Sequence, residues 1–112
     1  MSADDASAAH KKICDAYNEA ARAVQIATNG DNPALSGVAL VNGALILEHT
    51  VEATPGTAPA DKTAALALAE AYSNAQAIAP TVQQRSDPLW QSTISDVNTK
   101  DAVMKKACGG NP

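Results

Sequence analysis

Length, composition and charge narrow the classes of protein to consider. The chain has 112 residues, of which 46% are hydrophobic and 18% charged, with two cysteines and no phenylalanine. This length fits one domain with a modest core and leaves no room for a second core. A net charge of −4 argues against nucleic-acid binding, because that function needs clustered lysine and arginine side chains.

The N-terminal part of the chain predicts one long helix. We expect residues 1–112 to form a single helical domain, with residues 1–6 as a flexible or non-native leader. Apolar residues recur at helical spacing over about 5–28, with Ile13, Tyr17 and Val24 on the side that faces the core. Asn29-Gly30 is typical of a helix end in the left-handed conformation.

The second segment is the most apolar part of the chain. Asn32-Pro33 is typical of a capped helix start, so a helix is predicted over about 33–53. A strand over 38–47 is the alternative, and the flanking cap signals favour the helix. A helix that is apolar on nearly all sides is either central or an interface helix. We expect an interaction surface here, at Leu40, Gly43 and Leu47, together with Trp90 of the fourth helix.

Two more helices are predicted in the C-terminal half. A loop at 54–59 precedes a third helix over about 58–79, which Pro80 ends. Ser86-Asp87-Pro88 then opens a fourth helix that reaches Cys108, with Gly109 as its C-terminal cap. Four helices of about 20 residues with short connections predict an all-α, antiparallel up-down-up-down four-helix bundle.

The two cysteines lie near opposite ends of the chain. In such a bundle, Cys14 of the first helix and Cys108 at the end of the fourth lie at the same pole, so a disulfide is expected to close the fold. A persistent disulfide implies an oxidising compartment and hence export. Two alternatives are free buried thiols in a cytoplasmic protein, and a redox or metal role for Cys14 with His10, four residues earlier.

No pattern in the sequence predicts catalysis. Phosphate-binding loops, nucleophile elbows and zinc-protease motifs are absent, so we expect no enzyme, no cofactor and no metal site. Glu48, His49 and Glu52 form the one cluster with acid–base potential, and a solvated helix end is the simpler interpretation. Asn42 and Asp101 lie beside apolar positions, so they either satisfy each other, bind backbone or water, or line a polar pocket.

Several short motifs carry a resemblance to a known family. They are Ile13-Cys14-Asp15-Ala16-Tyr17, Ala23-Val24, Thr28-Asn29, Asn42-Gly43-Ala44-Leu45-Ile46-Leu47 and the closing cysteine. With these, the chain resembles small exported helical proteins of actinobacteria, mycobacteria included. The resemblance implies a fold and a compartment but no chemistry. Members often carry a transmembrane segment or lipoprotein leader, so this chain would be a trimmed form of an anchored protein.

These observations together predict a non-enzymatic function. We expect an extracytoplasmic helical binding module, secreted or envelope-anchored, that acts as an accessory subunit of a cell-envelope complex. Its expected partner is an envelope protein or a second copy of itself, with a removed N-terminal anchor placing it near the membrane. The alternative is a carrier of a small apolar ligand or lipid between the second and third helices. A cytoplasmic location is the second choice. No apolar run is long enough to predict a membrane span.

Overall fold

The computed structural model describes residues 3–30 and 32–109, and every regular element in those ranges is helical. Helix α1 spans Ala3–Thr28, a short 3-10 helix η1 (Pro33–Ser36) leads into α2 (Gly37–Ala53), and α3 spans Pro59–Ile78. A second 3-10 helix η2 (Ala79–Thr81) and a loop connect α3 to α4 (Pro88–Ala107). The predicted helix for the second segment is therefore confirmed, and the alternative of a strand over 38–47 is wrong. Of the expected leader, residues 3–6 belong to α1 and residues 1–2 lie outside the described residues.

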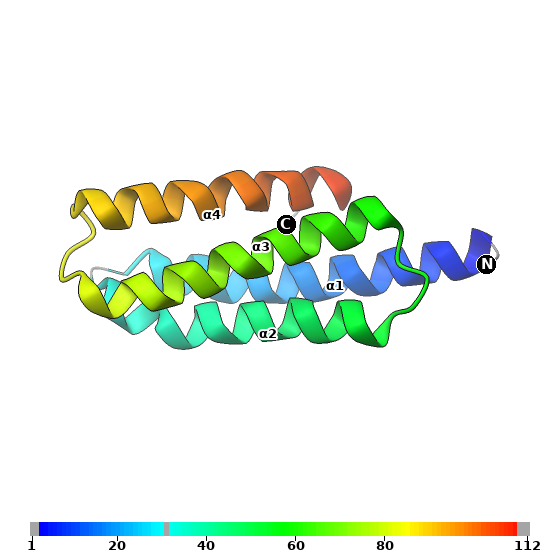
Figure 1. The fold of residues 1–112 in the computed structure, drawn as a ribbon, viewed down its shortest axis with the longest axis horizontal. Helices are drawn as coiled ribbons and strands as arrows, with labels where there is room; N and C mark the ends of the chain where they lie inside the picture. Colours follow the sequence, from blue (N-terminus) through cyan, green and yellow to red (C-terminus); the bar gives the residue numbers. More distant parts are fainter. Residues whose placement is uncertain (1–2, 31, 110–112) are drawn as a thin grey trace.

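Successive helices run in opposite directions, so the predicted antiparallel four-helix bundle is confirmed (Figure 1). Helix α1 packs against α2, α2 against α3, and α3 against α4. By contrast, α1 and α4 meet at few positions. Each helix in the bundle consequently packs mainly on the helix that precedes or follows it in the chain. The seam between α1 and α4, the first and last helices, has the least packing.

Proline occupies the first turn of η1, α3 and α4, and a polar side chain caps η1 and α4, the two starts at which the sequence predicted both signals. The Asn32 side chain accepts a hydrogen bond from the Ala34 amide at 3.0 Å, and Asp87 Oδ1 accepts one from the Leu89 amide at 2.9 Å. Pro33, Pro59 and Pro88 occupy first-turn positions. There the missing proline N–H costs nothing, because these amides have no partner within the helix.

The predicted left-handed end of α1 is wrong. Positive φ angles occur in the described residues at Gly56 (98°) and Gly109 (92°), and not at residues 29–30. The helix ends instead with backbone bonds from the Asn29 N–H to the Gln25 carbonyl at 3.2 Å and from the Gly30 N–H to the Ala27 carbonyl at 3.4 Å, which satisfy two of the last carbonyls of α1. Gly109 confirms the expected cap after α4, and its N–H bonds to the Lys106 carbonyl at 3.3 Å.

Small side chains make up most of the core. Its largest fully buried members are Trp90, Tyr17 and Tyr72, surrounded by buried alanines of α1 and α3. On α3, Leu66 is exposed, whereas Leu68 is fully buried. Alanine occurs on nearly every side of α3, so the apolar pattern does not define one face.

Gly43 allows α2 and α3 to approach closely. A Cβ atom at this position would lie 2.9 Å from two ring carbons of Tyr72, closer than real contacts allow. The Tyr72 ring is itself buried and has no space to move away. The α2–α3 interface therefore depends on the absence of a side chain at residue 43.

The Cys14–Cys108 disulfide is present, as predicted. The two Cα atoms lie 5.5 Å apart although the residues are separated by 94 positions. The bond joins the middle of α1 to the end of α4, across the seam where the two helices otherwise meet least. In the chain-entropy account, a cross-link over a loop of this size stabilises the fold by about 4–5 kcal/mol.

Substituting the two helical glycines of α2 should change stability in opposite directions. Gly43→Ala gains helix propensity of up to about 1 kcal/mol, but overpacking against Tyr72 costs about 1–3 kcal/mol, so we expect net destabilisation. Gly37→Ala meets nothing within 4 Å and should stabilise the protein. Urea unfolding of both variants measures the two effects, and equal changes in both would contradict the close approach at Gly43.

Candidate functional site

The predicted interaction surface is wrong, because its residues form part of the core. Leu40, Leu47 and Trp90 are fully buried, and Gly43 packs against the Tyr72 ring. The apolar character of α2 was recognised correctly, but its orientation was not. When both faces of a helix are apolar, the sequence pattern does not show which face the neighbouring helices cover.

The outward face of α2 carries the apolar side chains that the core does not use. Leu35 of η1 and Val38, Val41 and Leu45 of α2 expose 76%, 73%, 37% and 47% of their surface, respectively. Their spacing of three to four residues places them on one side of the helix, and we call this set the outer stripe. Figure 1 shows α2 at the edge of the bundle farthest from α4. The exposure of these side chains shows that the other helices do not cover this side of α2.

Polar groups interrupt and flank the outer stripe. Asn42 is exposed and lies between Val38 and Leu45 on the same face. Of the alternatives considered for it, pairing with Asp101 is therefore wrong, and contact with water is the one that fits. Glu48, His49 and Glu52 continue the helix beyond the stripe, with His49 and Glu52 exposed. In the described ranges, no three histidine, cysteine or acidic side chains are grouped to hold a metal ion.

The α2 region also has the composition of a membrane span. Pro33–Ala53 is 21 residues long and includes a window with a hydropathy of 1.4, enough by length and composition alone to cross a bilayer. This finding differs from the expectation based on uninterrupted apolar runs. Within the bundle, 33% of that window is buried. The same test is also passed by a mostly buried core helix and by a signal sequence near the N-terminus, so it does not by itself identify a membrane span.

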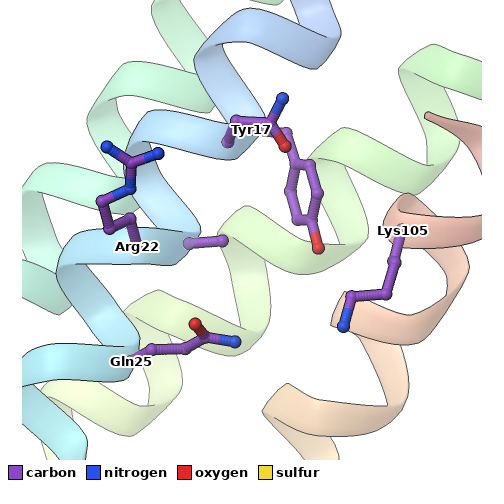
Figure 2. Close-up of a pocket in the computed structure, with 6 residues that line it drawn as sticks. Tyr17, Arg22, Gln25 and Lys105 are labelled. Carbon is purple, nitrogen blue, oxygen red and sulfur yellow. The ribbon is translucent and has the colours of Figure 1, made fainter. Parts of the chain in front are cut away.

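A groove of about 280 Å³ lies at the weak seam between α1 and α4 (Figure 2). It is lined by Tyr17, Asn18, Ala21, Arg22, Gln25 and Lys105. The Tyr17 hydroxyl donates to Asp101 Oδ1 at 2.8 Å and so bridges the two helices. The Oδ1 atom of Asn18 is buried, and no described residue donates a hydrogen bond to it.

Burial, with Asp101 as a further cause, makes both tyrosines weaker acids than usual. Burial and then the hydrogen bond with Asp101 raise the pKa of Tyr17 far above its usual value of 10.0. Burial, together with the nearby Asp101 charge, raises the pKa of Tyr72 in the same direction. The observed partner of Asp101 is thus the Tyr17 hydroxyl, which was not among the alternatives considered for it.

A second polar cluster surrounds the disulfide. His10 Nδ1 lies 2.6 Å from Asp61 Oδ2, and His10 Nε2 lies 3.5 Å from Cys14 Sγ. The sequence pointed to His10 and Cys14 because they are one helical turn apart. It gave no indication of Asp61, which is 51 residues from His10 and reaches it only because α3 begins beside α1.

An apolar hollow of about 460 Å³ lies between α3 and α4. Its lining residues are Pro59, Ala60, Thr63, Ala64, Ala67, Lys100 and Val103. The carrier hypothesis placed such a space between the second and third helices, where Tyr72 instead fills the gap over Gly43. An apolar ligand would therefore have to bind at a different helix pair from the one expected.

Comparison with known proteins adds no relative: no family model matches the chain, and neither the curated proteins nor the solved structures contain a match. The resemblance to exported actinobacterial proteins accordingly stays a prediction.

The buried tyrosines predict a loss of stability in alkaline solution. Because folding raises both tyrosine pKa values, their neutral forms stabilise the fold fully below pH 10, and this contribution is lost as the pH rises above 10. Tyr17→Phe should cost about 1–3 kcal/mol at neutral pH, because Asp101 loses its donor, and should reduce the alkaline loss. Urea unfolding below and above pH 10 tests this, and equal stability across that range would contradict it.

Proposed function

We propose that the chain is an extracytoplasmic interaction module that binds through the outer stripe of α2. The observation that carries the proposal is the exposure of four large aliphatic side chains, Leu35, Val38, Val41 and Leu45, on one helix face. Contiguous exposed apolar surface on a small protein marks a contact site more often than a solvated one. Its location on a regular helix favours a helix as the partner element.

The partner that fits this surface best is a second copy of α2 in antiparallel orientation. Acidic residues occur only at one end of the helix, at Glu48 and Glu52, and its first turn has none. A parallel pair would place Glu48 beside Glu48 of the second copy. An antiparallel pair places it near the amino end of the other helix, where negative charge is favoured.

Asn42 supports the same arrangement. With a two-fold axis between Val41 and Asn42, Val38 lies opposite Leu45 of the second copy, and the two Asn42 side chains meet near the axis. A side-chain amide donates and accepts at once, so two of them can pair with each other. A single polar residue within an apolar helix contact fixes the register of the pair.

The disulfide supports the extracytoplasmic part of the proposal. Disulfides persist in oxidising compartments and are rare in the cytoplasm, so Cys14–Cys108 favours export. The role of an accessory subunit in a cell-envelope complex, next to the membrane, follows from the actinobacterial resemblance and stays a prediction. In a homodimer, two copies of such a subunit would be joined through α2.

Sedimentation equilibrium over a range of concentrations tests the dimer. We expect a species of about twice the 11.4 kDa chain mass. Val38→Asp should raise the dissociation constant of the dimer by roughly a hundredfold or more, because each dimer would bury two unpaired carboxylates. Val103→Asp, the same change at an exposed position of α4, is the matched control and should leave the dimer intact. A monomer at every concentration, or equal weakening by both substitutions, would overturn the proposal.

The hollow between α3 and α4 favours a second candidate function, the binding of a small apolar ligand. Its volume of about 460 Å³ is within the range of small-molecule sites, and its lining is mostly alanine, proline and valine. Ala67→Leu would fill the hollow, so it should abolish binding of a fluorescent fatty-acid probe if the hollow is the site. Ala23→Leu, at an exposed position of α1, is the control. Probe binding that survives Ala67→Leu would argue against this function.

A further inference from the structure

Two side chains beside the disulfide, His10 and Asp61, are arranged so that His10 could donate a proton to a cysteine sulfur. His10 projects from α1 toward Asp61 in the first turn of α3, and their side chains meet at 2.6 Å. The other ring nitrogen of His10, Nε2, lies 3.5 Å from Cys14 Sγ. A carboxylate, an imidazole and a sulfur atom are thus aligned in that order, and the His10 side chain is 45% exposed, so solvent reaches the ring.

This order has a chemical consequence. A carboxylate that accepts the Nδ1 proton fixes the orientation of the ring, including the form that carries a proton on both nitrogens. In that form, the Nε2–H group points toward Cys14 Sγ. When a disulfide is cleaved by a thiolate, the departing sulfur leaves as a thiolate, and a proton donor beside it makes that departure easier.

We propose that Cys14–Cys108 is an exchange-active disulfide in which Cys14 is the leaving group, His10 is its proton donor and Asp61 is the residue that positions His10. One thiolate of an external dithiol attacks Cys108 Sγ, and the S–S bond breaks. The electron pair moves to Cys14 Sγ, which takes the proton from His10 Nε2. The second thiol of the dithiol then displaces Cys108, so the dithiol is oxidised and the protein gains two thiols.

The fold gives this reaction a structural outcome. Helix α4 packs chiefly on α3 and meets α1 at few positions. Besides the disulfide, the described side-chain link between α1 and α4 is the hydrogen bond from Tyr17 to Asp101. Reduction would therefore release the seam and widen the groove lined by Tyr17, Arg22 and Lys105. The proposal involves α1, α3 and α4 and is independent of the dimer contact on α2.

The rate of reduction separates this role from a structural one. The rate constant for reduction by excess dithiothreitol is obtained by alkylating the released thiols and measuring intact mass over time. We expect His10→Gln to slow reduction by roughly tenfold or more, since general acids contribute at least that much to such steps. If the contact of His10 with Asp61 only stabilises the packing of α1 against α3, the same substitution should lower the stability of the fold and leave the rate of reduction unchanged or higher. That result would overturn the proposal.

A matched control and a second readout complete the test. His49→Gln removes the other histidine, which is exposed on α2, and should leave the rate unchanged. With the monothiol glutathione, the trapped mixed disulfide should form on Cys108, with Cys14 released as the free thiol. Cleavage after Lys12 and Lys106 puts the two cysteines on separate peptides, so mass spectrometry identifies the attacked sulfur. Asp61→Asn should weaken this selectivity, whereas attack at both sulfurs in the native protein would contradict the assignment.

Discussion

The covalent link between α1 and α4 is the constraint on which the rest of the structure depends. The other helix pairs of the bundle are held by close packing, with alanines of α1 and α3 around a few large side chains. The pair α1–α4 has little such packing, and its groove contains polar and charged side chains in place of a core. At this seam the disulfide holds the two helices together, as apolar contacts do between the other helix pairs. It does so without requiring large side chains from either helix.

Helix α2 shows how one sequence can serve two surfaces. Its inner side chains Leu40, Ala44 and Leu47 fill the core, and its outer side chains Val38 and Leu45 remain in solvent. A helix with only an inner apolar face would have satisfied the fold. The additional apolar side chains lower the solubility of the free protein, so their presence favours a function outside the monomer.

The sequence predicts the elements of this fold better than their orientation. Proline defines the starts of η1, α3 and α4, with a polar cap added at η1 and α4, because the effect of these residues is local and does not depend on the rest of the chain. The cysteine pair follows from topology alone. The sequence did not show which side of α2 faces the core. Leu40 and Leu47 lie on the buried side, but equally apolar residues lie on the opposite side. The His10–Asp61 contact was also not predictable, because it depends on how α3 docks against α1 and no local pattern records that docking.

The single tryptophan gives the molecule an internal optical reporter. Trp90 is fully buried in the first turn of α4, and Cys108 follows the last turn of the same helix. Eighteen residues of helix separate them, a distance of about 27 Å. Its indole emission therefore responds to exposure at one end of α4 while the sulfur chemistry occurs at the other. A change in emission on reduction would show that the opening reaches the Trp90 end of α4, and an unchanged spectrum would show that this end stays buried.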